Sequence, residues 1–108
     1  MKVRSVAGKL VVLGSATLFA GAVYASPGEL FKKNGCAACH APAVKMVGPS
    51  LADIANKYKG QADAQAKLEK KVKAGGSGVW GPIPMPAQAQ LSDADNKAMV
   101  QWILSGAK

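Results

Sequence analysis

Histidine and cysteine are scarce in this chain, and their scarcity limits the chemistry open to it. The only histidine lies beside both cysteines, in the stretch Cys36-Ala37-Ala38-Cys39-His40. A structural zinc site needs four ligands in a tetrahedral array, whereas this cluster offers three crowded together. A disulfide would close only a tiny loop and stabilise little, and a thioredoxin-like redox pair needs a βαβ frame of which the sequence shows no sign. The cluster therefore needs another explanation.

Long apolar runs are also absent, except near the N-terminus. Lys2, Arg4 and Lys9 precede an uncharged, mostly apolar run over residues 10–23, and Val23-Tyr24-Ala25 resembles the site that a signal peptidase recognises. The run is shorter than the roughly 20 residues of a membrane-spanning helix, which favours cleavage after Ala25 over a retained anchor. We expect residues 1–25 to be a cleaved secretory signal peptide and residues 26–108 to form one exported domain, periplasmic in a bacterium with two membranes.

The exported domain is basic and small. Residues 26–108 contain 11 lysines and 6 acidic residues, a formal net charge of +5. An exported protein rarely meets nucleic acid, so we expect a partner protein with an acidic surface. The domain's 83 residues are close to the lower limit for a self-sufficient hydrophobic core, and aromatic residues make up only 6% of the chain. Something other than side chains is expected to supplement the core.

Four short helices are predicted, and no strands. Serine followed three residues later by an acid begins the first, second and fourth, while glycine follows the ends of the first three. The predicted ranges are about 26–34, 50–57, 63–73 and 92–105. The third carries an apolar face opposite lysines, and the fourth has an apolar stripe that includes Met99 and Trp102. Leu30 and Phe31 of the first helix are expected to pack against Trp102.

An extended loop is predicted between the last two helices. Its sequence, Gly78-Val79-Trp80-Gly81-Pro82-Ile83-Pro84-Met85-Pro86, alternates three prolines with other residues. Proline lacks a backbone N–H and fixes its own backbone angle, so this pattern excludes helix and central strand. The loop should be stiff.

Cys36-Ala37-Ala38-Cys39-His40 matches C-x-x-C-H, the attachment motif for c-type haem. Two thiols three positions apart on a helical turn can each form a thioether with one haem vinyl group, and the adjacent imidazole then points at the iron. Haem would also supplement the small hydrophobic core of the domain, because a large apolar macrocycle can form the centre of a core. We therefore expect one covalent haem c, held by Cys36 and Cys39, with His40 on the iron.

The sixth iron ligand has to come from elsewhere, and Met46, Met85, Met99, a lysine or no ligand at all are the candidates. Met85, between Pro84 and Pro86, has the rigid mount that a weak thioether ligand needs. Met99 falls on an apolar helix face, and Met46 follows His40 too closely to cross easily to the opposite haem face. Met85 is the favoured ligand. With both axial positions filled, the iron would be suited to outer-sphere electron transfer and not to oxygen chemistry.

The order of these motifs resembles that of the small monohaem class I cytochromes c of bacterial periplasms. The resemblance covers essentially all of residues 26–108 and rests on His40, Lys45-Met46-Val47-Gly48-Pro49, the proline-rich loop and Trp102-Ile103-Leu104-Ser105. It implies an all-α fold of about four short helices around one haem, with His40 and Met85 as axial ligands. It also implies an electron carrier, not an enzyme, that shuttles single electrons from a cytochrome bc complex to a terminal oxidase or reductase, such as haem-cd nitrite reductase.

The resemblance assigns roles to residues around the haem as well. The Pro49 carbonyl would accept a hydrogen bond from His40 Nδ1, and Trp80 would donate its indole N–H to a haem propionate, although a core tryptophan is an alternative. Relatives often have an arginine where Lys71 falls, but a solvated lysine is the better interpretation here. Gln88 is the candidate for an amide side chain near the methionine.

Two other classes of protein compete with the electron carrier. One is a haem enzyme or gas sensor in which Met85 is off the iron, and the other is a haem-free thiol or structural module. The carrier hypothesis predicts a monomer without stable membrane insertion that docks briefly through the haem edge. Its lysines should favour acidic surfaces of redox proteins, so association should slow as salt is added.

Overall fold

The computed structural model describes residues 26–108, together with Gly8 and Gly14, so the predicted signal peptide lies outside the described residues. Four α-helices follow one another, α1 (Pro27–Lys33), α2 (Leu51–Tyr58), α3 (Ala64–Ala74) and α4 (Asp93–Leu104), and a short 3-10 helix η1 (Cys36–Ala38) follows α1. Within residues 26–108 the only strand-like pairing is an isolated bridge between Gly76 and Met85. The all-α fold class and the four predicted helices are confirmed.

Serine side chains begin three of these helices. Ser26, Ser50 and Ser92 each accept a hydrogen bond from the backbone N–H three residues further on. That third residue is acidic in every case, and a negative charge in the first turn interacts favourably with the helix dipole. α4 is the longest at 12 residues. None of the helices in the described part of the chain is both long and apolar enough to cross a membrane.

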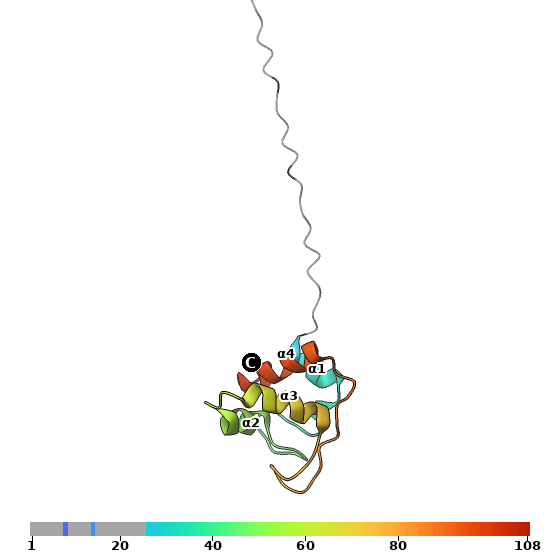
Figure 1. Cartoon of the computed structure of the whole chain (residues 1–108), viewed down its shortest axis with the longest axis vertical. Helices are drawn as coiled ribbons and strands as arrows, with labels where there is room; N and C mark the ends of the chain where they lie inside the picture. The colour runs from blue at the N-terminus through green and yellow to red at the C-terminus, as the bar shows by residue number, and fades with distance from the viewer. Residues whose placement is uncertain (1–7, 9–13, 15–25) are drawn as a thin grey trace, which may run out of the picture.

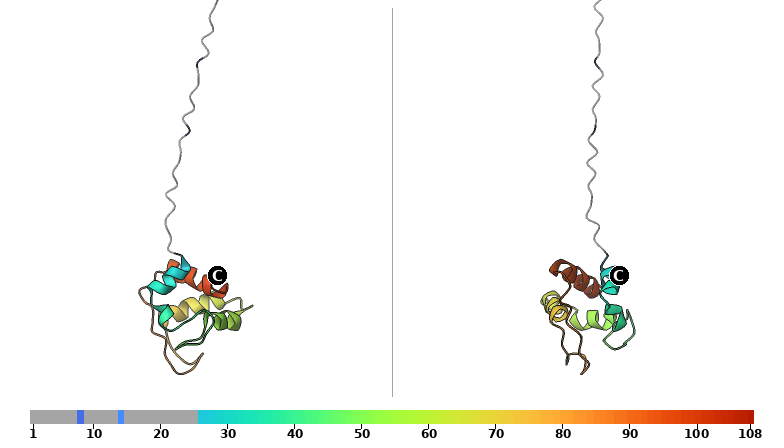
Figure 2. Two further views of the ribbon diagram at one scale, coloured as in Figure 1. Left: turned by 180° about the vertical axis from the view of Figure 1, so that it is seen from behind. Right: turned by 90° about the vertical axis from the view of Figure 1, so that its right-hand side faces the viewer.

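Helix α4 is the common packing partner, because it contacts α1, α2 and α3. Figures 1 and 2 show it beside α1 at one end of the domain, with α3 next to it. The rings of Phe31 and Trp102 join α1 to α4 with their centroids 5.6 Å apart, as predicted. Met99 and Val100 of α4 are 1% and 0% exposed, so Met99 belongs to the core.

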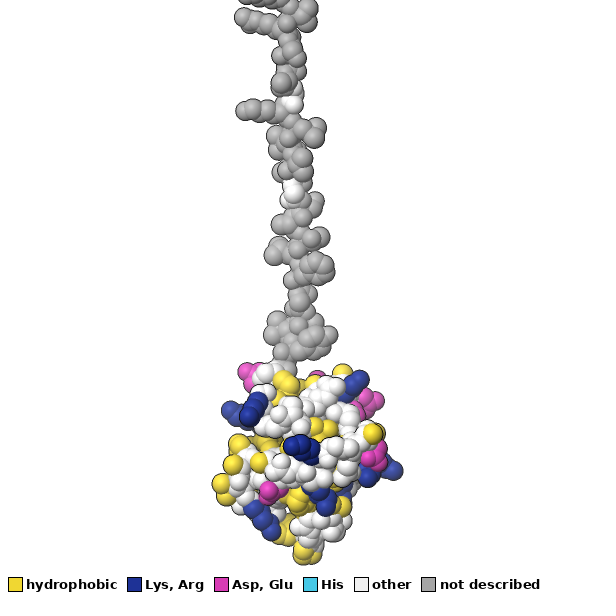
Figure 3. All heavy atoms as spheres, turned by 90° about the vertical axis from the view of Figure 1, so that its left-hand side faces the viewer, with side chains coloured by type: hydrophobic (Ala, Val, Ile, Leu, Met, Phe, Trp, Pro, Cys, Tyr) yellow, Lys and Arg dark blue, Asp and Glu magenta, His cyan; other side chains and the backbone are white. Residues whose placement is uncertain are grey.

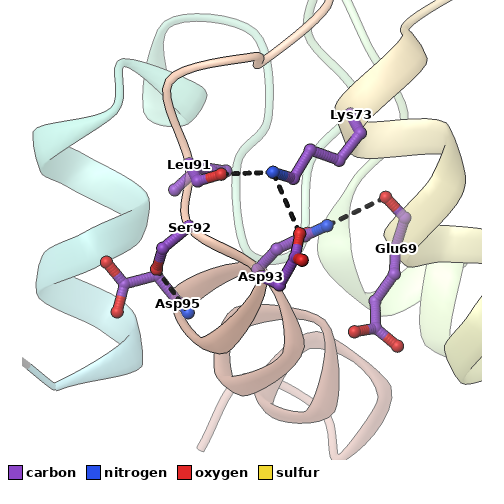
Figure 4. Close-up of polar contacts among 7 residues, drawn as sticks. Glu69, Lys73, Leu91, Ser92, Asp93 and Asp95 are labelled. Carbon is purple, nitrogen blue, oxygen red and sulfur yellow. Dashed lines mark hydrogen bonds and ion pairs between the residues drawn. The ribbon is translucent and has the colours of Figure 1, made fainter.

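Polar contacts join α3 to the start of α4 (Figure 4). The Lys73 ammonium donates to the Leu91 carbonyl and pairs with the Asp93 carboxylate at 3.1 Å. The side chain of Asn96, which is 2% exposed, donates to the Glu69 carbonyl at 2.9 Å. A buried amide that donates to a fixed carbonyl sets the register of two packed helices. These bonds determine where the long loop after α3 rejoins the helical part of the domain.

Candidate functional site

A cavity of about 630 Å³ lies between the helices and two loops, a volume typical of sites for small molecules. The loops, residues 41–49 and 75–91, extend toward the end of the domain away from α1 and α4 (Figure 1). Cys36, Cys39, His40 and Met85 all line this one cavity. Its wall also includes buried side chains from all four α-helices, namely Phe31, Leu51, Leu68, Val72, Val100 and Ile103.

A tight turn brings the cysteine motif to the cavity. Gly35 adopts a left-handed conformation with φ of 75° and directs the chain from α1 into η1. The backbone N–H groups of Cys39 and His40 both donate to the Cys36 carbonyl, at 3.1 and 3.0 Å. Cys36 and Cys39 are half-buried free thiols, and Cys36 packs against the hydrophobic core.

The electrostatics of Cys36 differ from those of a reactive thiol. Burial raises the pKa of the Cys36 thiol, a backbone hydrogen bond opposes this in part, and the neighbouring Cys39 raises it further. Catalytic and redox-sensing cysteines have a lowered pKa, because the thiolate is the nucleophile. The environment of Cys36 therefore argues against a thiol-based redox module.

The imidazole of His40 is fixed by the loop that follows it. Its Nδ1 lies 2.7 Å from the Pro49 carbonyl oxygen. A carbonyl can only accept, so Nδ1 carries the proton and the lone pair of Nε2 is free to bind a metal. Gly48 packs directly on the ring, since a Cβ at this position would lie 2.7 Å from His40 Cε1. The loop in turn is tied back by the Gly48 N–H, which donates to the Cys39 carbonyl at 2.8 Å.

The three methionines of the described chain differ in their surroundings, although all three line the cavity. Met99 is held in the core, and Met46 lies on a loop with 47% of its surface exposed. Met85 is half-buried and packs against the core cluster. Its backbone pairs with Gly76 through two hydrogen bonds, of 2.9 and 3.0 Å. Sequence reasoning missed this partner, because two glycines after a helix indicate only that the helix stops.

The family comparison decides what this arrangement is. Residues 27–107 match the family model for cytochrome c. The chain belongs to the cytochrome c family. This match accounts for both the all-α fold and the haem-attachment motif. The family resemblance seen in the sequence is confirmed.

Individual relatives of this cytochrome c agree with the family match. Cytochrome c-551 of Pseudomonas aeruginosa is 48% identical over 97 residues, which cover 89% of this chain and 92% of that protein. Cytochrome c-552 of Nitrosomonas europaea is 53% identical over 91 residues, covering 84% and 87%. The crystal structure of the wild-type Nitrosomonas protein superposes with a TM-score of 0.71, covering 73% of this chain and 98% of that one.

This cytochrome c is a small electron carrier that binds haem c covalently through Cys36 and Cys39. The cavity fits that group, because both thiols share it with an imidazole whose Nε2 is free and with a largely apolar wall. Among the described residues, no three His, Cys, Asp or Glu side chains gather as a protein-only metal site requires.

The remaining residues with a predicted role differ in whether they line the cavity. Trp80 lines the cavity and is 39% exposed, with the Lys57 ammonium 5.1 Å from its ring centroid. Lys71 is half-buried and lines the cavity instead of standing free in solvent. Gln88 does not line the cavity, and its amide bonds to the Pro86 carbonyl and to Gln90.

Replacing Gly48 with alanine should displace the His40 ring. The added methyl would overlap the imidazole, so the ring or the loop has to move and the 2.7 Å bond to Pro49 lengthens. We expect a loss of about 1–3 kcal/mol in the free energy of unfolding, together with shifted NMR signals of the His40 ring. Gly28→Ala is the matched control, since a Cβ there meets Trp102 at an ordinary 3.5 Å. Equal stability of the two variants, with unshifted His40 signals, would contradict the packing argument.

Proposed function

We propose that this cytochrome c is a periplasmic carrier of single electrons, with His40 and Met85 as the axial ligands of its haem iron. The observation that carries the proposal is that both side chains line the cavity of the two cysteines and that both are held by the surrounding backbone. Haem c supplies the one-electron couple of its iron. The protein's part is to fix the ligands and to exclude water.

His40 and Met85 would perform this part in different ways. The Pro49 carbonyl holds the proton of His40 on Nδ1, which keeps Nε2 as a ligand and makes the ring more electron-donating. Met85 offers a neutral thioether from a segment whose backbone is paired with Gly76. A neutral sulfur ligand and an apolar cavity wall both favour the less charged, reduced state, which raises the reduction potential. Trp80, also in the cavity wall, is proposed to donate its indole N–H to a propionate.

Two filled axial positions distinguish a carrier from a gas sensor or an oxygen-using enzyme. If His40 and Met85 both bind, the reduced protein has no open coordination site at neutral pH. The test is to expose reduced, purified protein to carbon monoxide and record its visible spectrum. No change is expected, whereas ready formation of a carbon monoxide complex would favour the sensor or enzyme.

The face through which electrons would pass is apolar. Five large hydrophobic side chains that line the cavity are exposed and are called here the apolar rim: Met46, Val47, Val79, Trp80 and Ile83. The loop of residues 75–91 contributes no charged residue to this face, whereas the loop of residues 41–49 contributes Lys45. Figure 3 shows hydrophobic side chains at the lower end and left edge of one face, with lysines and acids among them as well as above. We infer that close docking is made by the apolar rim, while the lysines act at longer range.

This division suits brief encounters with acidic redox proteins. Lysines steer an acidic partner toward the domain, and a mainly apolar contact lets it leave quickly. The proposed partners are a cytochrome bc complex as donor and a terminal oxidase or nitrite reductase as acceptor. With such partners, the association rate should fall as salt is added.

A lysine placed in the apolar rim should slow electron exchange between copies of the protein. In Ile83→Lys, two like charges would meet wherever the rims of two copies touch, and Ile83 is 62% exposed. Self-exchange, measured by NMR line broadening in mixtures of oxidised and reduced protein, should slow at least about tenfold, or ~1.4 kcal/mol in barrier. The control Gln101→Lys adds the same charge to α4, at the other end of the domain (Figure 1). Equal slowing in both variants would show that net charge, and not the rim, is responsible.

Export is the remaining part of the proposal, and it rests on the sequence of residues 1–25. The N-terminal residue of protein purified from the periplasm tests it directly. Ser26 at the N-terminus would support cleavage after Ala25, whereas an intact Met1 in membrane-bound material would favour the retained anchor.

A further inference from the structure

Two consecutive glycines at the end of α3 have positive φ angles, 67° at Gly75 and 127° at Gly76. The N–H of Gly75 donates to the Lys71 carbonyl at 2.7 Å and so completes the last turn of the helix. A single left-handed residue is enough to end a helix in this way. Helix termination therefore does not explain why a second glycine with positive φ follows, or why the chain turns as it does after Gly76.

The reason is the segment around Met85. Gly76 and Met85 exchange two backbone hydrogen bonds, and slightly further along the Gln88 N–H donates to the Val72 carbonyl at 3.0 Å. Met85 is flanked by Pro84 and Pro86, neither of which has an N–H to donate. Within these three residues the Met85 amide is therefore the sole donor, and it bonds to the end of α3.

Gly75 lies directly against this segment. A Cβ on Gly75 would lie 2.5 Å from the Met85 carbonyl oxygen and 2.7 Å from the Ala87 nitrogen. Both are backbone atoms, which cannot rotate away as the end of a side chain can. At Gly76, by contrast, a Cβ would come closest to the mobile end of Lys71, at 2.9 Å.

We propose that Gly75 is a positioning residue for Met85. By having no side chain, it lets the proline-flanked segment lie flat on the end of α3, and this contact sets how far the Met85 sulfur reaches into the cavity. The inference rests on the proposed role of Met85 as an iron ligand. It adds that the reach of the ligand is set by the end of α3, and not by the prolines of the loop alone.

The test compares Gly75→Ala with Gly60→Ala in the haem-loaded protein. Gly60 also has a positive φ, 78°, and nothing within 4 Å of a Cβ, so this control places an alanine at positive φ without the collision. Gly75, with φ of 67° and ψ of −161°, is in a region essentially open to glycine alone, so its backbone cost is larger and the deciding readouts are those of Met85. Both variants should unfold more easily than the wild type. In Gly75→Ala alone, we expect the near-infrared band of methionine-bound ferric haem to weaken or shift, the reduction potential to fall, and hydrogen exchange of the Met85 amide to speed up at least tenfold.

The outcomes separate this inference from the ligand assignment. If Gly75→Ala keeps the wild-type band and the wild-type exchange rate of Met85, the positioning role is wrong. If the near-infrared band survives in Met85→Ala, the ligand assignment is wrong, and the amide exchange rate still reports whether Gly75 holds the segment. Should Gly75→Ala fail to accumulate, Gly75→Asn with Gly60→Asn as control repeats the comparison, because asparagine takes positive φ more readily than alanine and still carries a Cβ.

Discussion

Met85→Ala is expected to abolish the near-infrared band of the oxidised protein and to lower its reduction potential by on the order of 0.1 V or more. Axial ligation and its surroundings move haem potentials over roughly 0.8 V, so the loss of a neutral sulfur ligand is a large perturbation. Without the thioether, water can reach the iron and stabilise the oxidised state. Absorption spectra of both oxidation states and a redox titration measure these changes. The reduced variant should also bind carbon monoxide.

Met46→Ala is the control for this prediction. Met46 lines the same cavity, but it lies on an exposed loop and is not paired with the end of α3. Its removal should leave the band and the potential close to those of the wild type. Loss of the band in Met46→Ala, with its retention in Met85→Ala, would exchange the two assignments. A wild-type protein with covalent haem but no such band would favour the open-site sensor or enzyme.

The second large effect is expected when both thiols are replaced. Cys36→Ser combined with Cys39→Ser removes the covalent attachment, and we expect the isolated protein to lose most of its helical circular dichroism. Without haem, the apolar wall of a cavity of about 630 Å³ would face water and lose its packing partner. Small domains are stable by only about 5–15 kcal/mol, so the loss of this packing is a large perturbation.

The single variant Cys36→Ser tests whether the haem or the thiols themselves matter. It keeps one thioether and so one covalent link, and its stability should lie between those of the wild type and the double variant. The measurement is thermal unfolding followed by circular dichroism, with haem content determined after denaturing extraction. A colourless double variant that unfolds cooperatively at the wild-type temperature would show that the chain builds a sufficient core without haem.

Sequence patterns predicted the helices well, because each is specified by neighbouring residues. Ser50 and Asp53, for example, are three positions apart and form the cap bond that begins α2. The haem motif is equally local, since five consecutive residues carry it. These features needed no knowledge of the rest of the chain.

The residues that sequence reasoning missed act across long separations. Gly75 and Gly76 were predicted only to end a helix, yet Gly76 pairs with Met85 and Gly75 packs against the same segment. Gly48 was noted only as part of a family motif and not for its contact with His40, which exists only after the loop has folded back. The position of Trp80 could not be predicted either, because a large aromatic side chain is compatible with the hydrophobic core and also with the edge of a cavity.

The position of α4 has a consequence for the order in which the fold forms. This helix contacts α1, α2 and α3, and it occupies residues 93–104, at the very end of the sequence. A growing or translocating polypeptide that lacks these residues has three short helices and no shared partner, and isolated helices of this length are marginal in water. The contact between α1 and α4 joins the two ends of the domain, so the entropy of a long closed loop opposes it until the last residues arrive. The packing of the first three helices is therefore completed only when residues 93–104 are available.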